Sequence, residues 1–315
     1  MSILITGSGL IGAQTAKLFV DKGDKVILYD IAPRPADISE IVDTNKITIV
    51  RGDILDLPFL LSIIREQEVD TVVHTAALLP AALLQNLYAG LRINVEGFTN
   101  ILEASRQMDV GRVVFTSTIG VYSRDGDGNT SETMDENFPV RPGSLYGMTK
   151  LMCESIGSNY FNKHGLDFVA LRFANVLGPW NGPLFTATGP LFKEMIGKPL
   201  KGEEAKIEKP SPIVTNGEWL YSKDAARALL LAGKKEGLTE RFFNIGMGRV
   251  YHISEMVEIV KDLIPGASIS LGTLPIVPAR AYNLDRSKRE LDYSPEYDLK
   301  RALSGYVDWL RARAN

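Results

Sequence analysis

Cysteine and histidine are scarce in this 315-residue chain, which has one cysteine, Cys153, and three histidines that lie far apart in the sequence (His74, His164 and His252). A single cysteine excludes a disulfide within the chain and favours a reducing compartment. Scattered histidines offer no cluster of ligands for a metal ion. No apolar run reaches the roughly 20 residues of a membrane-spanning helix, and charged residues interrupt the N-terminal apolar stretch, which argues against a signal peptide. The sequence therefore predicts a cytoplasmic protein that binds neither a metal nor a membrane.

An excess of positive charge is also lacking. The chain has 35 Lys and Arg residues against 38 Asp and Glu residues, which gives a net charge of −3. A nucleic-acid-binding domain carries a basic surface, so we expect no nucleic-acid partner. The hydrophobic fraction of 45% and the charged fraction of 23% are ordinary for a globular protein. Composition therefore indicates a globular chain with a large buried core.

Runs rich in Val, Ile and Leu alternate with longer amphipathic stretches in the first half of the chain. The expected strands are Ser2–Thr6, Lys25–Tyr29, Ile47–Val50, Thr71–Thr75, Arg112–Ser117 and Phe168–Arg172. The expected helices are Leu10–Lys22, Leu57–Glu66, Val95–Gln107 and Leu145–Lys163. Nearly continuous apolar strands are typical of a sheet covered on both faces, and repeated strand–helix–strand units imply right-handed crossovers. We therefore predict an α/β fold with a doubly wound (Rossmann) parallel sheet.

The pattern changes after Arg172, because residues 176–217 are dense in glycine and proline, which favours loops and short elements. Regular patterns resume after this segment, with an expected strand at Arg241–Ile245 and expected helices at Asp224–Gly233, Ser254–Leu263 and Leu299–Arg313. Ser254 is the expected N-cap of its helix. We predict a nucleotide-binding domain over residues 1–176, joined by returning segments near 214–245. Residues 177–213 and 246–315 are predicted to form a smaller, interleaved C-terminal substrate lobe.

A G-x-G-x-x-G pattern runs from Gly7 through Gly9 to Gly12, directly after the first expected strand and into the first expected helix. Such glycines allow a tight turn, the close approach of a pyrophosphate and close helix–strand packing. The phosphates would then meet the free N–H groups at the start of the helix, where Leu10 and Ile11 lie. We predict a dinucleotide site here; the alternative is a glycine-rich turn that binds nothing.

An acid follows the second expected strand. Asp30 stands 18 residues beyond Gly12, where a carboxylate accepts hydrogen bonds from an adenine ribose and repels a 2′-phosphate. Arg34 lies nearby and is able to bind such a phosphate. With one acid at the fingerprint position and a single arginine, we favour NAD over NADP.

The next two strand ends add further candidates. Asp53, followed by Ile54, comes after the third expected strand, where it is placed either to meet the adenine or to cap the next helix. Ala76 follows the fourth strand and is small enough to let a cofactor approach the backbone. His74 is interpreted as a structural strand-end histidine.

The candidate chemistry lies in a tyrosine and a lysine spaced four residues apart, Tyr146 and Lys150, which share one face of the helix expected over Leu145–Lys163. A free tyrosine has a pKa near 10, and a neighbouring ammonium lowers it by favouring the phenolate. Thr118 lies at the end of the strand upstream, with a hydroxyl placed to bond a reacting substrate oxygen. Alternatively, that hydroxyl bonds only to backbone.

These motifs together resemble an extended short-chain dehydrogenase/reductase, the NAD-dependent epimerase/dehydratase family. The resemblance covers nearly the whole chain in order, through Gly7, Asp30, Asp53, Ala76–Ala77, Asn94, Phe115–Tyr122, Tyr146–Lys150, Leu171–Pro179, Tyr221–Ala226, Phe243–Gly246 and Asp285–Lys288. It implies that Tyr146 is the acid/base and also contacts the cofactor, that Lys150 binds the nicotinamide ribose and lowers the pKa of the tyrosine, and that Thr118 orients the substrate. Asp30 is implied to hold the adenosine ribose and Asp53 the adenine, and Asn94 is expected to contact the cofactor.

Departures from the family pattern narrow the range of expected substrates. Sugar-nucleotide dehydratases place Asp-Glu directly after the catalytic threonine, where this chain has Ile119 and Gly120. The segment Leu78–Leu91 lacks the pattern of a typical galactose epimerase, and the lysines of residues 176–217 are scattered among acids rather than clustered for a diphosphate. The expected substrate contacts are Leu78, Ser117, Asn175 and Arg280.

The sequence thus favours an NAD-dependent dehydrogenase that oxidises a secondary alcohol of a sugar, a sugar acid or a similar small molecule. An NAD-dependent nucleotide-sugar epimerase without net redox change is the first alternative, and a non-catalytic NAD-binding sensor is the second. The resemblance further implies a homodimer through the helices near Val95–Gln107 and Leu145–Lys163.

Overall fold

The computed structural model describes residues 1–122, 133–182, 188–208, 210, 212–274 and 279–314. Seven strands form its central sheet, in the spatial order β3 (Thr48–Arg51), β2 (Lys25–Asp30), β1 (Ser2–Thr6), β4 (Thr71–His74), β5 (Arg112–Thr118), β7 (Asp167–Phe173) and β11 (Phe242–Ile245). All neighbouring pairs in this sheet are parallel. The strand order reverses between β1 and β4, which is where open α/β sheets bind their ligands. The predicted doubly wound sheet is confirmed.

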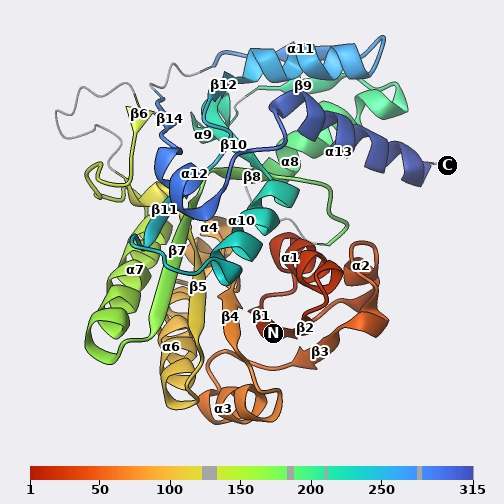
Figure 1. The fold of residues 1–315 in the computed structure, drawn as a ribbon. Helices are drawn as coiled ribbons and strands as arrows, with labels where there is room; N and C mark the ends of the chain where they lie inside the picture. The colour runs from red at the N-terminus through yellow and green to blue at the C-terminus, as the bar shows by residue number, and fades with distance from the viewer. Residues whose placement is uncertain (123–132, 183–187, 209, 211, 275–278, 315) are drawn as a thin grey trace.

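Helices cover both faces of the sheet (Figure 1). One face packs against α3 (Leu57–Glu66), α6 (Gly97–Gln107) and α7 (Leu145–His164). The other face packs against α1 (Leu10–Asp21), α2 (Pro35–Ser39) and α10 (Ser222–Lys234). The helix expected from Val95 begins only at Gly97, because a π-helical turn over Arg92–Glu96 precedes it.

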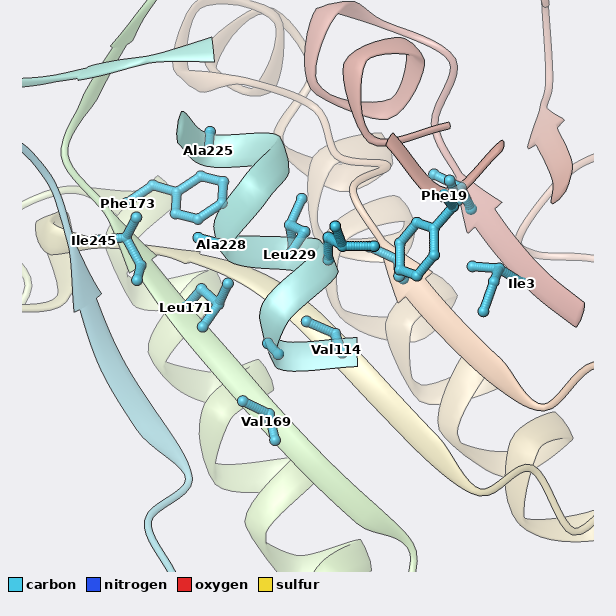
Figure 2. Close-up of a cluster of buried hydrophobic side chains, with 14 of the residues drawn as sticks. Ile3, Phe19, Val114, Val169, Leu171, Phe173, Ala225, Ala228, Leu229 and Ile245 are labelled. Carbon is cyan, nitrogen blue, oxygen red and sulfur yellow. The ribbon is translucent and has the colours of Figure 1, made fainter. Parts of the chain in front are cut away.

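The core beneath α10 shows what holds these layers together. Ala228 and Leu229 of α10 lie over Val114 of β5 and Leu171 of β7, with Phe19 of α1 beside them (Figure 2). All five side chains are fully buried. Burying a leucine or phenylalanine contributes about 1.5–3 kcal/mol, so this layer is a main source of stability.

A smaller lobe extends beyond the carboxyl ends of the sheet strands (Figure 1). Its paired strands are β8 (Asn175–Leu177), β10 (Asn216–Tyr221) and β12 (Val250–His252) in one sheet, β9 (Ala205–Ile207) with β13 (Ile269–Leu271), and β6 (Thr133–Met134) with β14 (Ala281–Tyr282). Its helices are α8 (Thr188–Phe192), α9 (Pro212–Thr215), α11 (Ile253–Leu263), α12 (Asp285–Leu291) and α13 (Leu299–Ala314). Between these segments the chain returns to the main fold as α10 and β11, so the two parts are interleaved. The domain boundaries themselves stay a prediction.

One helix start differs from the expectation. α11 begins at Ile253, and its N-cap is His252 rather than Ser254. The His252 ring nitrogen Nδ1 accepts the N–H of Ser254 at 3.3 Å, and the Glu255 carboxylate accepts the N–H of His252 at 3.3 Å. The prediction for Ser254 was wrong because this reciprocal capping box uses a histidine, which is not among the favoured cap residues.

None of the helices in the described part of the chain is long and apolar enough to cross a membrane. In the same residues, no group of three or more His, Cys, Asp and Glu side chains is arranged to hold a metal ion.

Candidate active site

The turn between β1 and α1 packs so closely that two of its glycines have no room for a side chain. Gly7 has a φ of +87°, in the left-handed region that favours glycine. A Cβ on Gly12 would lie 1.9 Å from the carbonyl oxygen of Gly7, and a Cβ on Gly7 would lie 2.8 Å from the backbone nitrogen of Ala76. Gly9 differs, because a Cβ there would meet nothing within 4 Å. The turn therefore joins β1, α1 and the loop after β4 while leaving space open at Gly9.

The start of α1 is suited to an anion. Gly9 is its N-cap residue, and no side chain in the described residues caps it. The first N–H groups of a helix, here including those of Leu10 and Ile11, have no partner within the helix. Together with the helix dipole, they attract a phosphate. The open space at Gly9 thus fits the pyrophosphate of a dinucleotide.

Asp30 braces the same turn from the end of β2. Its carboxylate accepts the N–H of Ser8 at 2.7 Å and the N–H of Ala32 at 2.8 Å. It lies next to β1 at the edge of the sheet where a doubly wound fold places an adenine ribose. Arg34 lies 3.4 Å from the carboxylate of Asp37, so its charge already has an acidic partner.

Asp53 follows β3 and turns the chain toward α3. Its carboxylate accepts the N–H of Leu55 at 2.9 Å. The N-cap of α3 is Asp56, whose carboxylate accepts the N–H three residues further on at 3.0 Å. The alternative that Asp53 caps this helix is therefore wrong, and its expected contact with adenine stays a prediction. Ile54 is buried against Gly97 of α6, where a Cβ would lie 2.6 Å from its side chain.

Tyr146 and Lys150 lie on one face of α7, with the Lys150 ammonium 5.7 Å from the centre of the Tyr146 ring. Lys150 is only 3% exposed. Its Nζ donates to the carbonyl oxygen of Thr116 at 2.7 Å and lies 4.5 Å from the centre of the Phe115 ring. Burial lowers the pKa of Lys150 to about 8 and raises the pKa of Tyr146.

The first turn of α7 packs directly on the segment after Thr118. A Cβ on Gly147 would lie 2.3 Å from the carbonyl oxygen of Gly120, so only glycine permits this approach. The contact brings Tyr146 to the end of β5, where Thr118 lies. The Thr118 hydroxyl oxygen accepts the N–H of Gly120 at 3.1 Å, which leaves its hydrogen to donate.

His74 has the structural role that the sequence indicated. It is 1% exposed, its Nδ1 lies 2.6 Å from the Thr6 hydroxyl, and its ring stacks on Phe115. Burial and the nearby Lys150 charge lower the pKa of His74 to about 3, so the ring is neutral near pH 7 and ties β4 to β1.

Asn94 shapes the loop after β4. Its buried side chain accepts the N–H of Leu78 at 2.7 Å and donates to the carbonyl oxygen of Leu78 at 3.0 Å. Both polar atoms of this side chain are thus bonded to the loop, and its expected contact with the cofactor stays a prediction.

Of the expected substrate residues, Asn175 contacts Glu218 and Arg280 contacts Phe138, whereas Ser117 is buried. Asn175 donates to the carbonyl oxygen of Glu218 at 3.1 Å, and the Glu218 carboxylate accepts the N–H of Tyr282, two residues beyond Arg280. The Arg280 guanidinium lies 5.6 Å from the centre of the Phe138 ring. Ser117 is instead buried, and its hydroxyl donates to the Glu154 carboxylate at 2.6 Å.

Sequence reasoning missed the buried ion pair behind this site. Glu154 and Arg172 are bonded at 2.7 Å, with side chains only 2% and 5% exposed. The available signal was weak: Glu154 stands four residues beyond Lys150, on the same helix face, and Arg172 lies inside the segment Leu171–Pro179.

Comparisons with known proteins identify the family of this chain. The family model "NAD dependent epimerase/dehydratase family" matches residues 3–246. A protein named "Putative UDP-glucose 4-epimerase" from Methanocaldococcus jannaschii is 30% identical over 98% of both chains. UDP-glucuronate 4-epimerase 4 from Arabidopsis thaliana is 28% identical over 98% of this chain and 75% of the relative. The crystal structure of UDP-glucose 4-epimerase with UDP-glucose from Thermotoga maritima is 25% identical, covers 100% of both chains and has a TM-score of 0.84.

The resemblance inferred from the sequence is therefore confirmed, as are the enzyme class and the NAD cofactor. The glycine turn, the uncapped start of α1 and Asp30 are the parts of the structure that fit this cofactor. The chain is an NAD-dependent enzyme that belongs to the NAD dependent epimerase/dehydratase family.

Proposed function

We propose that the protein is a nucleotide-sugar epimerase, which inverts a carbon that bears a secondary alcohol without net oxidation. The observation that carries this proposal is the similarity over 98% of both chains to a relative named "Putative UDP-glucose 4-epimerase". It is combined with the position of Tyr146, Lys150 and Thr118 near the end of β5. This places the first alternative from the sequence ahead of the dehydrogenase.

Bound NAD would supply the reversible oxidation of the alcohol. Tyr146 takes the proton from the reacting hydroxyl as general base and returns it as general acid. Thr118 holds the same oxygen with its free hydrogen. Burial raises the pKa of Tyr146 in this structure, and the ammonium of Lys150, 5.7 Å from the centre of the ring, would favour the phenolate once substrate and cofactor are bound.

The cofactor would lie across the carboxyl edge of the sheet. Gly9 and the N–H groups of Leu10 and Ile11 would hold the pyrophosphate, with Gly7 and Gly12 fixing the turn. Asp30 would bind the adenosine ribose, and Asp53 with Ile54 would face the adenine. Ala76 and Asn94 would line the path toward the nicotinamide, and Lys150 would bind its ribose.

The substrate would lie between the main sheet and the smaller lobe. Leu78 lies on the loop after β4. On the lobe side, Asn175 donates to the carbonyl oxygen of Glu218, and the Arg280 guanidinium lies over the Phe138 ring. Arg280 is the cation that we assign to the substrate phosphates.

A dehydrogenase of a smaller alcohol is the second candidate, and the lobe lysines favour it. Lys198 pairs with Glu194 at 2.7 Å and Lys206 with Glu204 at 3.3 Å. These ammonium groups already have acidic partners, which weakens the case for a diphosphate next to them.

A homodimer is part of the proposal. Exposed apolar side chains gather on α4 (Pro80–Gln85), α5 (Leu87–Leu91) and α7, and α4 packs against α7. These side chains are 45–74% exposed: Leu84, Leu87, Tyr88, Leu91, Met148 and Met152. Such a patch supports contact with a second copy through α7. A cytoplasmic location also belongs to the proposal and is supported by the single, buried Cys153.

Product analysis tests the function. The protein with excess NAD is incubated with UDP-glucose and separately with UDP-glucuronate, and the sugar products are identified by NMR. We expect the 4-epimer to appear, and we expect Tyr146→Phe to form none while still binding NAD. Failure of the wild-type protein to convert any nucleotide sugar would refute the proposal.

A further inference from the structure

We propose that Ser117, Glu154 and Arg172 form a buried clamp that sets the position of Tyr146 relative to Thr118 and so controls the rate of the chemical step. These three are positioning residues that do not touch the reacting atoms. The kinetic test of this inference rests on the proposed function. A second test, by hydrogen–deuterium exchange, is independent of it.

Glu154 extends the catalytic face of α7. Tyr146, Lys150 and Glu154 are each four residues apart, so all three point toward the sheet from one side of the helix. Two of them attach the helix to consecutive residues of β5: Lys150 bonds the carbonyl oxygen of Thr116 at 2.7 Å, and Glu154 accepts the hydroxyl of Ser117 at 2.6 Å. The next residue of the strand is Thr118. The two anchors therefore fix the helix beside the strand end that carries Thr118.

Arg172 holds the Glu154 carboxylate from the neighbouring strand. Its Nε and Nη2 donate to the two carboxylate oxygens at 3.0 and 2.7 Å, a bidentate pair that restricts both distance and orientation. Ser117 and Arg172 are direct partners in the parallel register of β5 and β7. The carboxylate is thus bound at once by two adjacent strands, which prevents α7 from sliding along either of them.

The third nitrogen of the Arg172 guanidinium is also bonded. Its Nη1 donates to the Tyr122 hydroxyl at 3.0 Å and to the carbonyl oxygen of Glu136 at 3.1 Å. The Tyr122 hydroxyl in turn donates to the side chain of Asn244 at 2.6 Å. Tyr122 closes the short turn after Thr118, and Asn244 lies on β11. The clamp thereby holds both ends of the segment that carries Thr118.

Stability alone does not explain such a pair. A buried ion pair contributes no more to stability than well-packed apolar side chains of equal volume, because desolvation offsets the attraction. What the pair adds is a bidentate geometry that apolar packing lacks. Since a displacement of about 1 Å at a reacting group can cost a hundredfold in rate, this geometry acts on catalysis.

Ser117→Ala tests the clamp, because it removes one hydroxyl and keeps the ion pair. We expect kcat to fall at least about tenfold, with KM for the nucleotide sugar and the affinity for NAD unchanged within about twofold. Ser117→Thr restores the hydroxyl and is expected to recover most of kcat. The matched control is Ser105→Ala on α6, whose hydroxyl is equally buried and has no hydrogen-bond partner in the described residues. This control should keep the wild-type kcat.

Hydrogen–deuterium exchange of the NAD-bound protein provides the readout that needs no substrate. We expect faster exchange at residues 145–151 in Ser117→Ala than in Ser105→Ala. If wild type turns over no nucleotide sugar, the proposed function fails, and the exchange rates alone decide the clamp. Equal exchange and equal kcat in the two alanine variants, even with a lower melting temperature for Ser117→Ala, would overturn it.

The double variant Glu154→Leu/Arg172→Met removes both charges together, so it avoids an unpaired buried charge, and it should show the same loss of kcat.

Discussion

Lys150 carries a positive charge at a place where the surroundings disfavour it. The ammonium is 3% exposed and bonded to one carbonyl oxygen, and burial lowers its pKa from 10.5 to about 8. Keeping this group charged below pH 8 therefore costs the folded protein free energy on the order of 3 kcal/mol. In the proposed mechanism this cost has a function, because the charge would favour the phenolate of Tyr146.

Lys150→Met should therefore separate stability from activity. We expect the variant to be as stable as wild type or more stable at pH 7, by at most about 3 kcal/mol, because the lost hydrogen bond offsets part of the gain. Turnover should fall at least about a thousandfold. The variant's advantage in unfolding free energy is full below pH 8. It disappears as the pH rises from about 8 toward 10.5, because the folded wild-type lysine has then lost its proton and no longer carries a buried charge. Urea unfolding at several pH values measures it; a variant clearly less stable than wild type at pH 7 would contradict this account.

At the scale of the element, the glycines of the β1–α1 turn have different roles although they belong to one motif. Gly12→Ala would place a Cβ 1.9 Å from the Gly7 carbonyl oxygen, so we expect a loss of at least about 2 kcal/mol in unfolding free energy. Gly9→Ala meets open space and should keep the stability within about 1 kcal/mol. Its Cβ would occupy the space assigned to the pyrophosphate, so the Kd for NAD should rise at least about tenfold. Calorimetric titration and thermal unfolding of both variants measure the two effects. Equal NAD affinity of Gly9→Ala and wild type would refute the assignment of that space.

The elements that the sequence predicted well are those determined by local patterns. Strands of the central sheet are buried on both faces and show nearly continuous apolar runs, so β1 and α3 match their predicted ranges and the others lie within two residues. Short elements of the smaller lobe were not predictable, because they depend on distant partners. β9 at Ala205–Ile207, for example, pairs with β13 at Ile269–Leu271.

The same distinction applies to the site. Spacing alone singled out Tyr146 and Lys150, since four residues form one turn of a helix. It placed Glu154 on the same helix face but did not indicate Arg172 as its partner, because that contact joins a helix to a strand and both charges are removed from water. The prediction of the N-cap failed for a similar reason at α11, where the tertiary setting lets His252 take the place of a usual cap residue.

At the scale of the whole molecule, the apolar patch on α4, α5 and α7 predicts the oligomeric state. Tyr88 is 74% exposed and Met152 is 52% exposed, and a glutamate at either position would put a charge into the proposed interface. We expect wild type to be a dimer and Tyr88→Glu/Met152→Glu a folded monomer by light scattering after size exclusion. Ile31→Glu, which changes an exposed apolar residue after β2, should stay dimeric. A monomeric wild-type protein would contradict the proposed interface.

The central claim is that the site oxidises and reduces the same carbon, so that no NADH leaves. The most direct test follows NADH absorbance with excess NAD while products are analysed in parallel, using UDP-glucose, UDP-glucuronate, free sugars, sugar acids and threonine-like hydroxy acids. We predict conversion of a nucleotide sugar to its epimer with no accumulation of NADH, abolished in Tyr146→Phe. Stoichiometric NADH from any of these substrates, without an epimerised product, would contradict the account and establish a dehydrogenase instead.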